Sequence, residues 1–195
     1  MTTPGRTPVV ALVCSAGGLD ALTRVLGRLP VDFPAVVLVL QHLQPGHVSE
    51  LADILSRRCV LPVRAAGDRV ALAPGVVTVA PAGSHLLVTP TDTTALVRSG
   101  GFPPSRPSAD LLLTSMGLSL GARAIAVVLS GGGHDAATGA TVVHDFGGTL
   151  IAADEPSSEA YAMPAASIDR TQVDHVVDVD DIGDLLVTLV ARARP

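Results

Sequence analysis

A short apolar run that turns directly into a serine and two glycines constrains the fold of this chain more than any other stretch. Residues 9–13 are all apolar and three of them are valine, which favours a strand buried on both faces of a sheet. Apolar residues then recur at helical spacing from Leu19 to Leu29. Ser15 therefore lies on a predicted strand-to-helix turn, where Gly17 and Gly18 allow the backbone to bend sharply.

Taken alone, this turn fits more than one kind of chemistry. The free N–H groups at the start of the following helix point back toward Ser15 and favour negative charge. A serine hydroxyl beside N–H groups that stabilise an anion is suited to acyl transfer. Similar turns bind phosphate, or only connect a strand to a helix, in many doubly wound folds.

Composition narrows the class of protein. The chain has 195 residues, of which 48% are apolar and only 2% aromatic, so we expect one domain over residues 1–195 with a core of Val, Leu and Ala. A net charge of −5, with arginines scattered singly, argues against a nucleic-acid partner. Cys14 and Cys59 form neither a disulfide framework nor a metal-binding set, which favours a cytoplasmic protein. No stretch is long enough to insert into a membrane.

Predicted strands and helices alternate along the chain, which indicates a parallel sheet. Strands are expected at residues 9–13, 35–40, 62–65, 76–80, 124–129, 149–153 and 176–177. Helices are expected at residues 19–29, 48–58, 109–120, 136–145 and 182–194, with a short one from residue 161. Residues 85–89 and 94–98 form a candidate hairpin. We therefore predict an α/β fold with a doubly wound, mostly parallel sheet, helices on both faces and a small antiparallel hairpin at the edge.

Three polar residues follow the three strongest predicted strands. Ser15, His42 and Asp135 are a nucleophile, a base and a carboxylate that can orient the base. Residues just after parallel strands gather at one edge of the sheet, even when they lie far apart in the sequence. The coincidence of residue type and position is far more specific than any one of the three turns.

Several blocks of residues occur in the order found in one known family. The blocks are Cys14–Gly18, Gln41–Leu43 with Pro45 and Gly46, Val79–Leu87, Arg106–Asp110, Leu129–Asp135 and Tyr161–Pro164. Together they resemble the catalytic domain of the chemotaxis protein-glutamate methylesterases of the CheB type. The resemblance covers nearly the whole chain.

The resemblance implies roles for the three polar residues. Ser15 would be the nucleophile, His42 the general base, and Asp135 the carboxylate that orients His42. The family hydrolyses γ-methyl glutamate esters, and some members deamidate glutamine, on helical chemoreceptor signalling domains. The implied partner is thus a methylated chemoreceptor-like protein, and neither a cofactor nor a metal is expected.

The chain departs from the family pattern around the expected substrate and oxyanion side of the site, formed by Ala16, Gly17, Gly132 and Gly133. Ala16 stands where relatives usually have a hydroxyl residue, and Gly132 where they have a methionine whose backbone N–H is thought to serve the oxyanion hole. Ala136 replaces a usual glycine. Because the first strand is expected at Val9, we expect no receiver domain before it, and control by phosphorylation would then come from a separate receiver-domain protein or not occur at all.

Other interpretations of the same residues stay open. His134 and His144, each followed by an aspartate, suggest a metal site, but their spacing matches no ligand pattern. His85 is expected to be a satisfied polar residue or to line the cleft. A non-catalytic descendant could bind a signalling partner through the same cleft. A phosphate or nucleotide binder has less support, because the chain lacks a G-x-G-x-x-G or P-loop spacing.

Overall fold

A seven-stranded parallel sheet forms the centre of the fold in the computed structural model, which describes residues 7–42, 50–99 and 106–193. Its strands are β1 Val9–Cys14, β2 Val36–Gln41, β3 Val63–Ala65, β4 Val77–Val79, β7 Ala124–Val128, β8 Thr149–Ala153 and β9 His175–Val177. Their order across the sheet is β3-β4-β2-β1-β7-β8-β9, and every neighbouring pair is parallel. The predicted fold class is confirmed.

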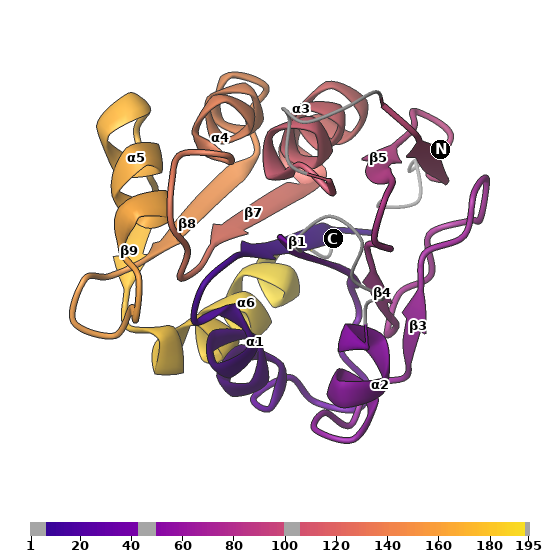
Figure 1. Ribbon diagram of the computed structural model, residues 1–195. Helices are drawn as coiled ribbons and strands as arrows, with labels where there is room; N and C mark the ends of the chain where they lie inside the picture. The colour runs from indigo at the N-terminus through magenta and orange to yellow at the C-terminus, as the bar shows by residue number, and fades with distance from the viewer. Residues whose placement is uncertain (1–6, 43–49, 100–105, 194–195) are drawn as a thin grey trace.

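Helices cover both faces of this sheet (Figure 1). One layer contains α1 Gly18–Leu26, α2 Leu51–Ser56 and α6 Val179–Arg192, and the other contains α3 Ala109–Leu120, α4 Ala137–Asp145 and α5 Ala162–Arg170. A short 3-10 helix, Gly121–Arg123, joins α3 to β7.

Alternation along the strands produces two separate cores. In β1, Val10, Leu12 and Cys14 face the layer of α1, α2 and α6. Val9 and Val13 face the layer of α3, α4 and α5. All six residues of β1 are buried, as expected for a central strand covered on both sides.

The predicted hairpin forms a small sheet of its own. Strands β5 His85–Val88 and β6 Thr94–Val97 pair with each other in antiparallel fashion, and β5 packs against α3 instead of pairing with the large sheet. Two serines of α3 hold its backbone: the Val88 N–H donates to Ser115 Oγ (3.0 Å), and Ser119 Oγ donates to the Val88 carbonyl (3.0 Å). These bonds satisfy polar groups of β5 that a neighbouring strand would otherwise pair.

The chain reverses its direction of winding at β1. After β1 it forms β2, β3 and β4 on one side, with β4 between β2 and β3, and it then crosses to β7, β8 and β9 on the other side. The connections after β1 and β7 lead to helices on opposite faces of the sheet, and the carboxyl ends of these two strands form a topological switch point, where doubly wound sheets bind ligands. Ser15 follows β1 and Asp135 follows β7.

Three helices differ in extent from the prediction, and the first of them, α1, ends at Leu26 instead of residue 29. Helix α2 covers Leu51–Ser56, and residues 48 and 49 of the expected helix lie outside the described residues. Helix α6 begins at Val179, three residues before the expected start, because the Asp178 side chain accepts the Asp180 N–H (2.8 Å) and caps its first turn. Aspartates that the sequence places before the helix thus belong to its cap and first turn.

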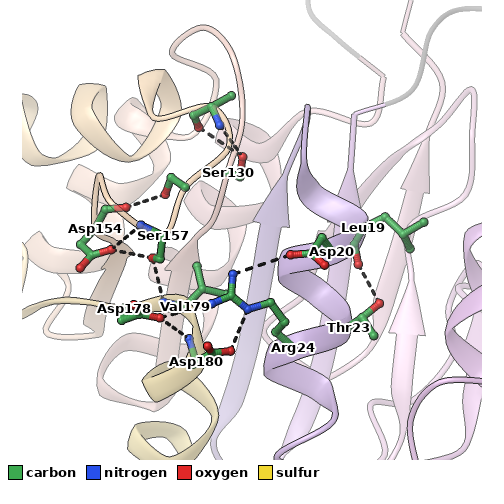
Figure 2. Close-up of polar contacts among 12 residues, drawn as sticks. Leu19, Asp20, Thr23, Arg24, Ser130, Asp154, Ser157, Asp178, Val179 and Asp180 are labelled. Atoms are coloured by element: carbon green, nitrogen blue, oxygen red, sulfur yellow. Dashed lines mark hydrogen bonds and ion pairs between the residues drawn. The ribbon is translucent and has the colours of Figure 1, made fainter.

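An ionic cluster ties α1 to the start of α6 (Figure 2). Arg24 Nε donates to Asp180 Oδ1 at 2.7 Å, and its NH2 group lies 3.4 Å from Asp178 Oδ1. Asp20 lies one turn away at 3.7 Å. Because these side chains are largely exposed, the cluster fixes the orientation of the two helices more than it stabilises them.

One residue between β7 and α4 has a backbone conformation that L-amino acids rarely adopt. Ala136 has φ 148° and ψ −23°, and its side chain is fully buried. Glycine adopts this conformation without steric cost, whereas a residue with a Cβ pays on the order of 1–3 kcal/mol. Ala136 therefore occupies a position that suits glycine better.

We expect Ala136→Gly to raise the free energy of unfolding by about 1 kcal/mol, because relief of backbone strain exceeds the loss of one buried methyl group. Urea unfolding monitored by circular dichroism measures the change. Ala140→Gly is the matched control: Ala140 is equally buried but lies inside α4, so its replacement should lower stability by about 1 kcal/mol or more. A loss of stability in both variants would contradict strain at Ala136.

Candidate active site

Ser15 lies directly after the central strand and is fixed by backbone bonds on both sides. Its N–H donates to the Ser130 carbonyl (2.9 Å), and its own carbonyl accepts the Gly18 N–H (3.0 Å). The first bond joins the loop after β1 to the loop after β7, and the second closes the turn into α1. Ser15 is half-buried, so its hydroxyl is accessible at the carboxyl end of the sheet.

The buried Ser130 side chain also binds the turn that contains Ser15. Its Oγ donates to the Ala16 carbonyl (2.7 Å) and accepts the Ala160 N–H (2.9 Å), and it is one of the hydroxyls drawn in Figure 2. Ser130 is 1% exposed. One hydroxyl thus connects the Ser15 turn with the loop that precedes α5.

Two glycines are required where these loops approach each other. Gly17 has φ 71°, and a Cβ on it would lie 2.7 Å from both Ser130 Oγ and the Cβ of Glu159. A Cβ on Gly131 would overlap the sulfur of Met163 and lie 3.0 Å from Ser15 Cβ. Any larger residue at these positions would push Ser15 or the loop after β7 out of place.

A glycine and a cysteine pack together beneath the serine turn. A Cβ on Gly18 would overlap Cys14 Sγ, so the first residue of α1 lies directly on the thiol. Burial raises the pKa of Cys14, which keeps the thiol protonated at neutral pH. Cys14 is a small core residue, although it precedes the serine.

His42 is placed beside Ser15 by strand pairing. Cys14 is in register with Gln41, and the His42 N–H donates to the Cys14 carbonyl (3.0 Å). Its ring Nε2 lies 2.7 Å from Asp135 Oδ2, and the side chains of His42 and Asp135 are only 12% and 22% exposed. The end of β2 and the loop after β7 therefore meet across the end of β1.

The start of α3 holds the Asp135 carboxylate. Oδ1 accepts the Ser108 hydroxyl (2.9 Å) and the Asp110 N–H (2.9 Å), while Oδ2 accepts the Ala109 N–H (3.0 Å) as well as the bond from His42. Ser108 is the N-cap of α3, where the free N–H groups and the helix dipole favour a negative charge.

Protonation of this pair follows from its contacts. Burial alone would raise the pKa of Asp135, but hydrogen bonds from His42 and from the N–H groups of Asp110 and Ala109 outweigh it and lower the pKa below its ordinary value. An ionised carboxylate only accepts hydrogen bonds, so His42 Nε2 carries the proton that it donates to Asp135. The other ring nitrogen, Nδ1, is then free to accept a proton.

Asp110 links the starts of α3 and α4. Its N–H donates to Asp135, and its own Oδ1 accepts the N–H groups of Ala136 (3.2 Å) and Gly139 (2.8 Å). Burial raises the pKa of Asp110, although these N–H bonds work in the opposite direction. Asp135 is thus held between two helix starts that are bound to each other.

Free backbone donors occur in the loop after β1 and in the loop after β7. The N–H groups of Ala16, Gly17, Gly132 and Gly133 have no acceptor within the parts of the chain that the structure describes. A Cβ added to Gly132 or Gly133 would meet no atom within 4 Å, so this loop borders open space. Unpaired N–H groups around a serine are the donors that an oxyanion requires.

A groove of about 360 Å³ borders the same loop, between the start of α4 and the end of α5. Its lining residues are His134, Ala137, Thr138, Ala166, Asp169 and Arg170. His134, which precedes Asp135, is exposed there.

The structure brings His42 and Asp135 into direct contact and places Ser15 at the end of the adjoining strand. No hydrogen bond joins the Ser15 hydroxyl to the His42 ring in the described ranges. A modest rotation of the serine side chain on substrate binding remains our expectation, since catalytic bonds are often loose without substrate.

His85 is buried at 1% exposure and has hydrogen-bond partners at both ring nitrogens, as expected of a satisfied polar residue. Among the described residues, no three His, Cys, Asp or Glu side chains could hold a metal ion. No helix in the described part of the chain has the length and apolar character of a membrane span.

Sequence reasoning missed the residues that hold the site together. It predicted a helix from residue 109, but not the bond from Ser108 to Asp135, and it gave Ser130 and Asp110 no role. The available signal was their place in the blocks Arg106–Asp110 and Leu129–Asp135, where a serine or aspartate beside a helix start indicates capping.

The arrangement agrees with comparisons with known proteins. A model of the CheB methylesterase family matches residues 10–186, which include Ser15, His42, Asp135 and the helices that hold them. The chain belongs to the CheB methylesterase family. Its fold is therefore the fold of the family's catalytic domain.

Two curated relatives and one solved structure illustrate the similarity. The protein-glutamate methylesterase FrzG of Myxococcus xanthus is 40% identical over 96% of this chain and 56% of its own length. A protein-glutamate methylesterase/protein-glutamine glutaminase of Oleidesulfovibrio alaskensis is 35% identical over 94% of this chain and 51% of its own length. The chain thus spans about half the length of these relatives.

The solved structure corresponds to the whole described fold. The catalytic domain of the CheB methylesterase of Thermotoga maritima superposes with a TM-score of 0.89 at 32% sequence identity. The match covers 94% of this chain and 99% of the Thermotoga chain.

We expect Ser130→Ala to lower the free energy of unfolding by about 1–3 kcal/mol, because the Ala16 carbonyl and the Ala160 N–H lose a buried partner. Urea unfolding measures the change. Ser56→Ala is the control: this exposed hydroxyl donates to the Asp53 carbonyl (2.8 Å), and its loss should stay within about 0.5 kcal/mol. Equal losses of stability in both variants would contradict the inference that the Ser130 hydroxyl holds the two loops together.

Proposed function

We propose that this chain hydrolyses γ-methyl esters of glutamate in a protein substrate, with Ser15 as nucleophile, His42 as general base and Asp135 as the orienting carboxylate. The observation that carries the proposal is the 2.7 Å contact between His42 Nε2 and Asp135, one strand away from a serine on a glycine turn. Membership of the CheB methylesterase family supports the same reaction.

The first half of the reaction forms an ester on the serine. Ser15 Oγ attacks the ester carbonyl while His42 Nδ1 takes the hydroxyl proton, and the Asp135 carboxylate stabilises the resulting imidazolium. His42 returns the proton to the methoxy oxygen as the carbon–oxygen bond breaks, so methanol leaves and the glutamyl group stays on Ser15.

Water completes the reaction. His42 takes a proton from a water molecule that attacks the glutamyl–Ser15 carbonyl, and it then gives the proton to Ser15 Oγ as the bond to the serine breaks. Each turnover consumes one water and releases methanol and a glutamate side chain. The free N–H groups of Ala16, Gly17, Gly132 and Gly133 are the proposed donors to the oxyanion in both halves.

The proposed substrate is a methylated chemoreceptor-like helical protein in the cytoplasm. The names of the relatives couple methylesterase with protein-glutamine glutaminase activity. Deamidation would follow the same steps, with ammonia leaving in place of methanol. The groove between α4 and α5 gives the rest of a protein substrate a surface beside the site. Control by a separate receiver-domain protein is part of the same proposal.

If Ser15 is the nucleophile, a fluorophosphonate probe should label the protein at Ser15, and Ser15→Ala or His42→Ala should lower methanol release on the order of a millionfold. Mass spectrometry of the labelled peptide and a methanol-release assay measure the two effects. Ser56→Ala should be labelled and active, because Ser56 is an exposed residue of α2. Full activity in Ser15→Ala would refute the assignment, and loss of activity with a chelator would favour a metal enzyme instead.

The departures at Gly132 and Ala16 predict a slow enzyme. A flexible glycine holds its N–H less firmly than a larger residue, so Gly132→Met, which open space accommodates, should raise kcat, by less than the hundredfold that a missing oxyanion donor costs. Ala16→Thr, which restores a hydroxyl beside the nucleophile, should act in the same direction. Methanol release from methylated receptor fragments measures both.

The control for this series is Gly133→Met. Gly133 has φ 83°, so the same side chain strains the backbone there and should not raise kcat. A wild type without turnover or probe labelling, with no rescue by Gly132→Met or Ala16→Thr, yet with tight binding to the fragment, would show that the cleft is a binding module.

A further inference from the structure

One buried histidine contacts Ser108, a residue that binds the Asp135 carboxylate. His85, the first residue of β5, is 1% exposed and makes two ring contacts. Its Nδ1 accepts the Ser108 N–H at 3.2 Å, and its Nε2 lies 2.9 Å from Ser99 Oγ. The ring therefore connects the hairpin to the start of α3.

The contacts of His85 determine which nitrogen carries the proton. A backbone N–H can only donate, so Nδ1 must be unprotonated, and the proton lies on Nε2 and is donated to Ser99. Burial lowers the pKa of His85, and the nearby charge of Arg106 lowers it further, although Asp135 acts in the opposite direction. His85 is thus a neutral ring with Nδ1 as a permanent acceptor at neutral pH.

We propose that His85 is a positioning residue that orients Asp135, and through it His42, by holding the first residue of the α3 N-terminus. The catalytic consequence rests on the function proposed above. Nothing in this role requires His85 to touch substrate.

The N-cap residue Ser108 and the first three residues of α3 each donate their N–H to a side chain near the site. Ser108 donates to His85, Ala109 and Asp110 donate to Asp135, and Leu111 donates to Ser108 Oγ (3.4 Å). Ser108 is itself 1% exposed, so water cannot replace His85 as its acceptor at low cost.

Loss of the His85 acceptor would therefore affect Asp135 through Ser108 and the neighbouring residue Ala109, which both donate hydrogen bonds to its carboxylate. The unpaired Ser108 N–H would turn toward another acceptor and move the Ser108 hydroxyl, which donates to Asp135 Oδ1 at 2.9 Å. The neighbouring Ala109 N–H shares Oδ2 with His42. A small rotation of the helix start thus changes the angle at which the carboxylate meets the His42 ring.

Two amide substitutions at His85 distinguish the loss of the Ser108 acceptor from the loss of ring packing. In His85→Asn the side-chain oxygen can take the place of Nδ1 and accept the Ser108 N–H, whereas His85→Gln places its amide near Nε2 and leaves Ser108 without an acceptor. Both variants remove the ring and lose similar packing. We expect His85→Asn to keep most of kcat and His85→Gln to lose roughly tenfold to a hundredfold, with KM changed less than about twofold in either.

A measurement that does not depend on catalysis tests the same link. In NMR spectra of protein with labelled histidine rings, the His42 Nε2 proton bonded to Asp135 should keep its chemical shift in His85→Asn and change it in His85→Gln. If the wild type has no esterase activity, the proposed function fails, but this signal still tests the positioning role. His175→Asn, on the far edge strand β9, should leave kcat and the signal unchanged.

A third variant covers the case in which neither His85 variant folds. Ser99→Ala removes the acceptor of the His85 Nε2 proton without entering the core, because Ser99 is half-buried. It should lower kcat severalfold, and Ser99→Thr, which keeps the hydroxyl, should recover most of the loss. Equal kcat and equal His42 signals in the Asn and Gln variants, or no effect of Ser99→Ala, would mean that His85 only fills space.

Discussion

The buried charge of Asp135 is the constraint on which the site depends. A carboxylate with 22% exposure needs partners to remain ionised, and Asp135 finds them in the Ser108 hydroxyl, two N–H groups of α3 and the His42 ring. These partners come from the helix after the hairpin and from the strand beside β1. Satisfying one charge therefore fixes the relative positions of α3, β2 and the loop after β7.

The parallel sheet makes this convergence possible at low entropic cost. Strands β2, β1 and β7 lie side by side with their carboxyl ends at the same edge, so His42 contacts Asp135 although more than ninety positions separate them, and Ser15 follows the strand between. Backbone bonds between these loops, such as Ser15 N–H to the Ser130 carbonyl, hold the ends of the strands together. None of the three residues thus needs a long loop of its own to lie at this edge.

The departures from the family pattern differ in their physical cost. Ala136 is accommodated with a strained backbone, and Asp110 binds its N–H and limits how far the turn can relax. A Cβ on Gly132 would meet no atom within 4 Å, so packing does not require a glycine there, and a glycine restrains its own N–H less than a larger residue would. One substitution therefore acts on stability and the other on the order of the proposed oxyanion donors.

The sequence by itself determined the layers of the fold and the position of the three polar residues, because valine-rich runs and glycine turns report on strands and their ends locally. It predicted Ser15, His42 and Asp135 at strand ends, and the contact between His42 and Asp135 agrees with the expectation that these ends gather at one edge. Only the tertiary structure decided what holds them. The contacts of Ser130, Ser108, Asp110 and His85 join segments far apart in the chain, and a serine or histidine at such a position looks locally like any capping or core residue. Hydrogen bonds between distant segments depend on packing geometry, which no local pattern encodes.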